Sequence, residues 1–163
     1  MRILFIAMAD SVHTARWISQ IDNLGWDIHL FPSKDYGVVH PDLKNITIYH
    51  SFYGRQKNCD RTVRFRGIPV FSEVIAAIGR RTLKEIFPNY RVLQLKHLIK
   101  RLKPDIIHSI EIQAAGYLTL DVRRQYGDRF PSWVVTNFGS DIYLFGRLPE
   151  HVEKIKAVLK PMG

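Results

Sequence analysis

Apolar and polar residues along this chain follow two patterns, one typical of buried strands and one typical of amphipathic helices. Residues 3–8 are continuously apolar, as expected for a strand covered on both faces of a parallel sheet. Apolar residues then recur at steps of three and four over residues 15–24, which is helical spacing, and Gly25 is placed to end that helix. Residues 26–31 alternate between apolar and polar, so they predict a second strand.

The remaining sequence continues this order. Short apolar stretches predict three further strands, at residues 45–49, 105–110 and 133–137. Helical spacing predicts helices at residues 73–87, 90–102, 113–126 and 150–159. Residues 51–67 are polar, basic and without a period, so we expect a loop there. Strands that alternate with helices predict one α/β domain, a Rossmann-like doubly wound parallel sheet, and right-handed crossovers predict the strand order 3-2-1-4-5.

Composition narrows the class of protein. Hydrophobic residues make up 46% and charged residues 24% of the 163 residues, a globular mixture in a chain the size of one domain. The only cysteine, Cys59, excludes a disulfide framework within the chain and a cysteine-based zinc site. No small-residue cleavage site follows the first apolar run, which we therefore interpret as a strand and not as a signal peptide. These features predict a cytoplasmic protein.

Positive charge is concentrated in the middle of the chain. The net charge is +9, and residues 55–103 hold 13 basic and three acidic residues, a net charge of +10. A basic segment on a neutral scaffold suggests an anionic partner, either a membrane surface, a phosphate-bearing substrate or nucleic acid; a solvated basic face is the simpler alternative. The expected membrane or anion contacts are Arg55, Arg64, Arg66, Arg80 and Arg81.

Candidate binding residues follow from the expected fold. Ligands of a doubly wound sheet bind beyond the carboxyl ends of its strands. The polar residues placed there are Asp10, Ser11 and His13 after the first strand, His108, Glu111 and Gln113 in and after the fourth, and Gly139, Ser140 and Asp141 after the fifth. Three of them have a structural interpretation as well, because Ser11, Glu111 and Asp141 can each cap a helix. His108 lies within an apolar strand, where a hydrogen-bonded core histidine is the commoner case.

Several chemistries lack their sequence motif. There is no GxGxxG after the first strand, no GxxxxGK[ST] loop, no HExxH or paired histidine spacing, and no GxSxG elbow. We therefore expect no cofactor and no metal ion. A nucleic-acid-binding module is disfavoured, because no RRM, KH or helix-turn-helix pattern is present and the basic residues lie on amphipathic helices instead of among stacking aromatic side chains.

Four segments, in order and at matching spacing, carry a resemblance to a known family. They are MRILFIA…SVHTARWISQIDNLGWDIHLF, LKHLIKRLKPDIIHS, EIQAAGY and FPSWVVTNFGSDIYLFGRLP. Together they span most of residues 1–150. On these segments the chain resembles the N-terminal half of a family 4, or group 1, glycosyltransferase with the GT-B fold.

This resemblance implies a two-domain enzyme of the hexosyltransferase type, active in polysaccharide biosynthesis. Residues 1–163 would form the Rossmann-like domain that binds a glycan or lipid-linked acceptor, and a C-terminal domain absent from this chain would bind the nucleotide-sugar donor. Transfer would take place between the domains, with retention of the anomeric configuration and without a metal, so the isolated chain would be inactive. Lipid-linked acceptors imply a peripheral position at the cytoplasmic face of a membrane.

Two positions depart from the pattern of these relatives. Many carry Gly-Gly in the first loop, where this chain has Ala9-Asp10-Ser11, and many carry a second histidine at the position of Ile110. The missing histidine shifts attention to Glu111 and Gln113. Glu111 and Asp141 are the candidate catalytic residues, with the other polar residues at the strand ends as acceptor-binding candidates. The alternatives are half of a GT-B nucleotide-sugar epimerase of the non-hydrolysing type and a non-catalytic domain with an anionic partner.

Overall fold

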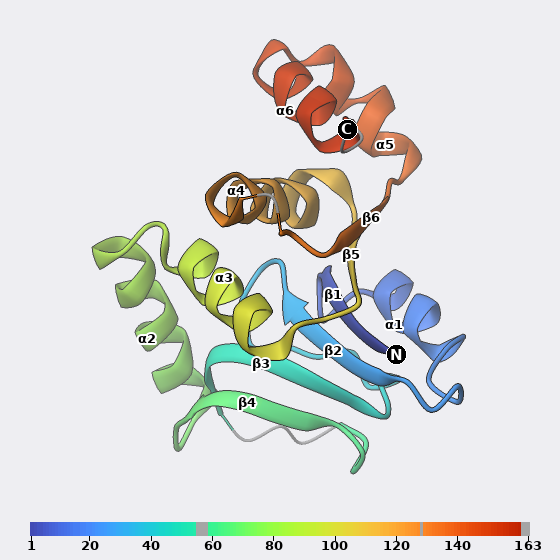
Figure 1. Ribbon diagram of the computed structural model, residues 1–163. Helices are drawn as coiled ribbons and strands as arrows, with labels where there is room; N and C mark the ends of the chain where they lie inside the picture. The colour runs from blue at the N-terminus through green and yellow to red at the C-terminus, as the bar shows by residue number, and fades with distance from the viewer. Residues whose placement is uncertain (55–58, 128, 161–163) are drawn as a thin grey trace.

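A six-stranded, fully parallel sheet forms the centre of the protein (Figure 1). The computed structural model describes residues 1–54, 59–127 and 129–160. The strands are β1 (Arg2–Ala7), β2 (Asp27–Pro32), β3 (Ile46–Tyr53), β4 (Arg64–Pro69), β5 (Ile106–Ile110) and β6 (Ser132–Thr136). Their order across the sheet is β4-β3-β2-β1-β5-β6. The predicted fold class and the relative order of the five predicted strands are therefore confirmed.

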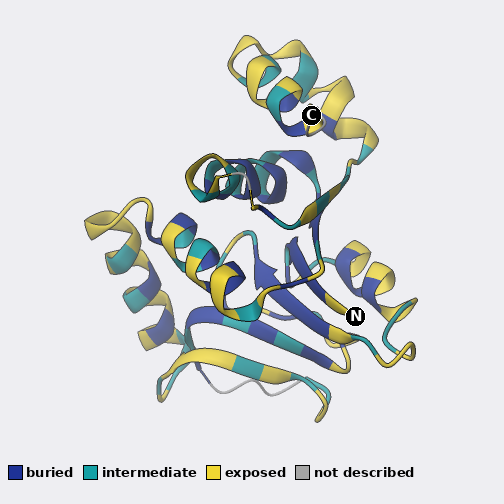
Figure 2. Ribbon diagram, viewed as in Figure 1, coloured by how far each residue is buried: buried dark blue, intermediate teal, exposed yellow. Residues whose placement is uncertain are grey.

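Helices cover both faces of the sheet. They are α1 (Val12–Ser19), α2 (Glu73–Ile86), α3 (Tyr90–Leu102), α4 (Tyr117–Tyr126), α5 (Gly139–Tyr143) and α6 (Pro149–Leu159), with a π-helical segment at Ile112–Gly116 and a 3₁₀ turn at Phe145–Arg147. Ile18 of α1 packs in one core with Phe5 and Leu30. Leu95 of α3 packs in a second core with Leu4, on the opposite face of the sheet. Alternate residues of β1 fill the two cores, which is why this strand is continuously apolar from Ile3 to Ala7, and the central strands are largely buried (Figure 2).

The expectation of a loop over residues 51–67 was wrong at both ends; residues 59–63 are neither helix nor strand, and residues 55–58 lie outside the described residues. Strand β3 continues to Tyr53, and β4 adds a sixth strand at the edge of the sheet. Side chains of β4 are mostly exposed, so this strand lacks the apolar pattern by which the other strands are found. An irregularity between Tyr49 and Phe52 shifts the register of the pair. At this point a Cβ on Gly67 would lie 2.1 Å from the carbonyl oxygen of His50, so the close approach of β4 requires glycine.

Two helices differ in extent from their predictions. α1 ends at Ser19 instead of continuing to Leu24, because the chain leaves the helix in successive turns in which Ile21 donates to the carbonyl of Ile18 at 3.0 Å and Leu24 to that of Ile21 at 3.1 Å. The helix expected from residue 113 begins instead as the π-helical segment and becomes α-helical only at Tyr117.

Helix α2 packs through its polar side. Its buried residues are Ala76 and Arg80, and its Gly79 lies against the ring of Phe52. Arg80 donates hydrogen bonds to the carbonyl oxygens of Phe52 at 2.6 Å and Tyr36 at 3.1 Å and pairs with Glu73 at 3.3 Å. The apolar residues on and around the helix face solvent, with exposed fractions of 50–99% (Figure 2): Ile68, Phe71, Val74, Ile75, Ile78, Ile86 and Phe87.

Candidate functional site at the carboxyl ends of the strands

The order of strands reverses between β1 and β5, which lie side by side although they are far apart in the sequence. In an open α/β sheet such a switch point leaves a crevice beyond the carboxyl ends of the two strands, where ligands bind. Asp10, Ser11 and His13 follow β1, and Glu111 follows β5. The candidate residues from two distant parts of the sequence therefore reach the same edge of the sheet.

Glu111 occupies a backbone conformation that residues other than glycine rarely adopt. Its φ is 84° and its ψ is 149°, in a region that costs on the order of 1–3 kcal/mol for a side chain with a Cβ. Its N–H donates to the carbonyl oxygen of Thr136 at 2.9 Å, and its own carbonyl accepts from Gly116 at 3.1 Å. The π-helical segment Ile112–Gly116 follows directly. Strained backbone and single π-helical turns are both concentrated at functional sites.

The Glu111 carboxyl is half-buried among polar groups. Ser33, which follows β2, donates its hydroxyl hydrogen bond to Oε1 of Glu111 at 3.3 Å. Burial raises the pKa of Glu111; the positive charge of Lys34 opposes this effect and the negative charge of Asp141 adds to it. A carboxyl group with a raised pKa at the end of a central strand is the feature most typical of a functional residue in this domain.

Asp141 ties the end of β6 to the start of the π-helical segment. It is 4% exposed, and its Oδ2 accepts the backbone N–H of Phe138 and of Ile112, both at 3.0 Å. The side-chain amide of Gln113 donates to the carbonyl oxygen of Asp141 at 2.9 Å. Gln113 and Asp141, both candidate site residues, are thus in contact. The Asp141 carboxylate caps the two backbone segments and holds them together at the site.

The residues after β1 reach the residues after β6. Ser11 is the N-cap of α1, with its Oγ accepting the N–H of His13 at 3.2 Å. The ring of His13 lies 5.2 Å from the ring of Phe138. The other candidates at this edge, Asp10, Gly139 and Ser140, are exposed, so they are accessible to a ligand.

His108 lies within β5 and not at its end. Its Nε2 is 2.8 Å from the hydroxyl oxygen of Thr136, and its ring contacts those of Phe5 and Trp17 at 5.2 and 5.5 Å. Burial lowers the pKa of His108, so the neutral ring is favoured. Its placement is that of a hydrogen-bonded core histidine, two residues before the strand end at which Glu111 follows.

Ser33 and Lys34 are site residues that the sequence interpretation missed. They follow β2, and the rule applied to the other strands would have found them. Asp35 holds this segment in place, with Oδ1 2.7 Å from Nδ1 of His50 and Oδ2 accepting the N–H of Ser51 at 2.9 Å. Burial by itself raises the pKa of Asp35, but the hydrogen bond with His50 and the charge of Arg91, 3.4 Å away, outweigh burial and lower it to about 2.

A cavity of about 520 Å³ opens beside Ser33 and Lys34 and extends to α2 and α3. It is lined by five basic residues and one acid: Lys34, Arg80, Arg81, Lys84, Arg91 and Asp35. A ligand that reaches from Glu111 past Ser33 therefore enters a region of positive potential.

A comparison with protein families connects this geometry with an activity. The model of a family described as glycosyl transferase 4-like matches residues 2–160. The chain belongs to this glycosyl transferase 4-like family. No curated protein matches the chain. The protein is therefore a glycosyltransferase, and the edge that carries Glu111 belongs to its N-terminal, Rossmann-like domain.

The five arginines predicted to contact a membrane or an anion have different environments in this glycosyltransferase domain. Arg64 and Arg66 are exposed on β4, and Arg81 is exposed and pairs with Glu85 at 3.0 Å. Arg80 is only 6% exposed, since its guanidinium binds the protein's own carbonyl oxygens, so it does not belong to an external surface. Arg55 lies outside the described residues.

Within the described part of the chain, no helix combines the length and the apolar character needed to cross a bilayer. Across the same residues, no three His, Cys, Asp or Glu side chains lie close enough together to hold a metal ion.

Proposed function

We propose that this glycosyl transferase 4-like domain binds the acceptor in a two-domain enzyme, which transfers a hexose from a nucleotide sugar to a hydroxyl group of a glycan or lipid-linked acceptor with retention. The single observation that carries the proposal is Glu111, a half-buried carboxyl group on a strained backbone at the switch point of the sheet. It is the group best placed to hold a hydroxyl group of an acceptor in this crevice.

In the proposed reaction the acceptor oxygen bonds to the anomeric carbon as the bond from that carbon to the nucleoside diphosphate breaks. The diphosphate leaves with the electron pair and takes up the proton of the acceptor hydroxyl group. The domain contributes by orienting the acceptor, which can account for a large part of a barrier. Glu111 accepts a hydrogen bond from the reacting hydroxyl group, and Ser33 fixes the orientation of the carboxylate. Asp141 is a positioning residue, because its carboxylate holds the two backbone segments beside Glu111.

The donor would bind to a second domain that residues 1–163 do not contain. We therefore expect the isolated chain not to transfer sugar, because donor and acceptor are then not held together.

The test uses the full-length enzyme with Glu111→Gln and with Glu153→Gln as the matched control on an exposed helix. If the acceptor contact contributes about 2–4 kcal/mol to the transition state, kcat/KM for transfer falls roughly 30- to 1000-fold in Glu111→Gln. Hydrolysis of the donor by water should change little, since Glu111 is proposed to contact the acceptor and not the donor. Asp141→Asn should lower both transfer and the thermal midpoint of unfolding. Unchanged transfer in Glu111→Gln would contradict the assignment.

We also propose that the enzyme is cytoplasmic and meets its acceptor at an anionic membrane surface through the outer face of α2. This face exposes Ile75 and Ile78, Phe71 is exposed just before the helix, and Arg81 and Lys84 are exposed on the same helix. Apolar side chains beside basic ones are typical of helices that lie in a membrane interface, and each basic residue near an anionic surface contributes about 1 kcal/mol.

Co-sedimentation with vesicles tests this attachment. Binding to anionic vesicles should weaken as salt is raised and should be largely lost in Phe71→Ser with Ile78→Ser and in Arg81→Glu with Lys84→Glu. The matched control, Lys154→Glu with Lys156→Glu on α6, should bind like the wild type. Equal binding of the control and the α2 variants, or no preference for anionic over neutral vesicles, would refute the membrane proposal without touching the assignment of Glu111.

A further inference from the structure

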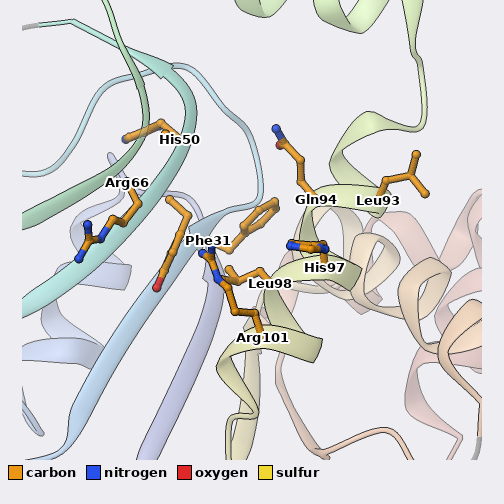
Figure 3. A pocket seen from close by; sticks show the side chains of 10 residues that line it. Phe31, His50, Arg66, Leu93, Gln94, His97, Leu98 and Arg101 are labelled. Carbon is orange, nitrogen blue, oxygen red and sulfur yellow. The ribbon is translucent and has the colours of Figure 1, made fainter.

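A second cavity of about 520 Å³ lies between α3 and the strands β2, β3 and β4 (Figure 3). It is lined by Phe31, Tyr49, His50, Arg66, Gly67, Leu93, Gln94, His97, Leu98 and Arg101. None of these residues belongs to the site around Glu111 or to the cavity beside Ser33. The sugar-transfer reaction therefore leaves this cavity without a role.

The charged groups of this cavity are all cationic. Arg66 and Arg101 line it together with the exposed imidazole of His97, and its ten lining residues include no acid. Among the described residues, no carboxylate lies within ion-pair distance of either arginine. In this part of the basic segment the positive charge is not used to hold the fold together.

Arg66 and Arg101 flank Tyr49, whose hydroxyl oxygen lies 3.0 Å from Nδ1 of His29. Burial raises the pKa of Tyr49; the positive charges of Arg101, Arg66 and Arg2 oppose that rise, and the negative charge of Asp27 adds to it. The two arginines come from opposite walls, since Arg101 lies in α3 and Arg66 is the β4 partner of Tyr49. An anion beside the Tyr49 hydroxyl group would feel both charges.

The apolar side chains of the lining are those of Phe31, Leu93 and Leu98. Phe31 and Leu98 are 2% and 4% exposed, and the Arg91 guanidinium covers the Phe31 ring at 3.8 Å. Figure 3 shows His97 and Arg101 extending from α3 toward Phe31, whereas His50 extends away from α3. Phe31 and Leu98 are therefore a buried base of the cavity, and Arg66 and Arg101 give it its charge.

We propose that this cavity binds a phosphate group, held by Arg66 and Arg101. Guanidinium groups present several N–H donors in a planar fork that matches the oxygens of a phosphate. Gln94 supplies a further donor, because its Oε1 already accepts from Ser51 at 3.0 Å and Arg91 at 3.2 Å and its amide N–H groups remain for a ligand. The phosphate group belongs either to a lipid headgroup or to a soluble ester.

The test is a titration of the 163-residue chain followed by ¹H–¹⁵N NMR and by calorimetry. The probes are hexyl phosphate below its micelle concentration, inorganic phosphate, and hexyl glucoside, which has the same alkyl chain on a neutral head. We expect hexyl phosphate to shift the amide signals of Phe31, Tyr49 and residues 94–101, and hexyl glucoside to leave them unchanged. Inorganic phosphate that shifts the same signals with equal affinity identifies a soluble phosphate as the ligand; weaker binding of inorganic phosphate identifies a lipid-like ester.

Paired variants decide whether the two arginines are responsible. Arg66→Gln with Arg101→Gln should weaken hexyl phosphate by roughly tenfold for each arginine removed, the usual effect of losing a charged hydrogen bond. The matched control is Lys96→Gln with Lys100→Gln, which removes the same charge from α3 outside the cavity lining and should bind within about twofold of the wild type. Dispersed NMR spectra confirm that each variant is folded. Equal weakening in both pairs, shifts confined to other residues, or equal binding of hexyl glucoside would overturn the proposal.

Discussion

The packing of α2 predicts that a buried charge stabilises the domain more than the apolar residues of the same helix. We compare Arg80→Met, which keeps an unbranched side chain of similar reach, with Ile78→Ser on the outer face. A rule that places apolar residues inside and charged residues outside would predict a small effect for Arg80 and a large one for Ile78. The structure predicts the opposite order, because Arg80 is 6% and Ile78 is 61% exposed.

The size of the Arg80 effect follows from the groups it leaves unpaired. Its guanidinium satisfies the carbonyl oxygens of Phe52 and Tyr36, and a hydrogen bond to a charged group contributes about 1.5–3 kcal/mol. The ion pair with Glu73 adds little, since the Glu73 side chain is 42% exposed and screened by solvent. Methionine regains part of the loss through apolar burial. We therefore expect Arg80→Met to lower the free energy of unfolding by about 3 kcal/mol.

Ile78→Ser should change that free energy by less than about 0.5 kcal/mol, as for other exposed substitutions. Urea denaturation followed by circular dichroism measures both variants, and an unchanged m-value shows that the midpoints report stability alone. A larger loss in Ile78→Ser than in Arg80→Met would mean that α2 packs through its apolar face, and it would remove the basis for the proposed membrane surface as well.

Two other substitutions test how the segments around the site are held. The pKa of Asp35 is lowered to about 2 from 3.8, so its contribution to stability is present above pH 3.8 and is lost as the pH falls toward 2. Between pH 5 and pH 2 the wild type should therefore lose about 2 kcal/mol more free energy of unfolding than Asp35→Asn. Parallel pH profiles of the two proteins would contradict this. Gly67→Ala places a Cβ against the His50 carbonyl oxygen at a φ of +135°. We therefore expect β4 to detach from β3, with faster amide hydrogen exchange in Phe65 and Ile68. In the control variant Gly127→Ala the added Cβ meets nothing within 4 Å, so exchange in β4 should be unchanged.

The core of the sheet could be predicted because each of its strands leaves a local signal. Residues of β1 contact apolar side chains on both faces, so the sequence there is continuously apolar from Ile3 to Ala7. β4 leaves no such signal, because it pairs through its backbone and carries exposed arginines at Arg64 and Arg66. Charged side chains of this kind are common on edge strands, where they discourage pairing with other chains.

The face by which α2 packs could not be predicted for a different reason. Helical spacing identifies the apolar side of a helix, but it does not say what lies next to it. Here the neighbouring groups are two carbonyl oxygens distant in the sequence, that of Phe52 in β3 and that of Tyr36 after β2. Only a long donor can satisfy them, so Arg80 turns inward and the apolar side faces outward.

At the candidate site, the strand-end rule located residues but not their tasks. Glu111 and Asp141 both follow strands and both were candidate catalytic residues. Asp141 caps backbone N–H groups on two segments, whereas the Glu111 carboxyl accepts a hydrogen bond from the side chain of Ser33 and interacts with the backbone of Ala115 in the adjoining π-helical segment. The roles of Asp141 and Glu111 differ because of partners distant in the sequence, Ile112 for Asp141 and Ser33 for Glu111. A local sequence pattern contains no information about such partners.

The basic segment shows why a charge sum in a sequence does not define one surface. Two of its arginines, Arg80 and Arg91, are turned inward and bind carbonyl oxygens or Asp35. Arg66 and Arg101 line a cavity without acids, and Arg81 is exposed on α2. The inward pair cannot be exchanged for lysine without losing its forked geometry, whereas the exposed residues act mainly through charge. Substituting each set by lysine should therefore destabilise the domain only in the first case, which separates the structural use of this charge from its use in binding.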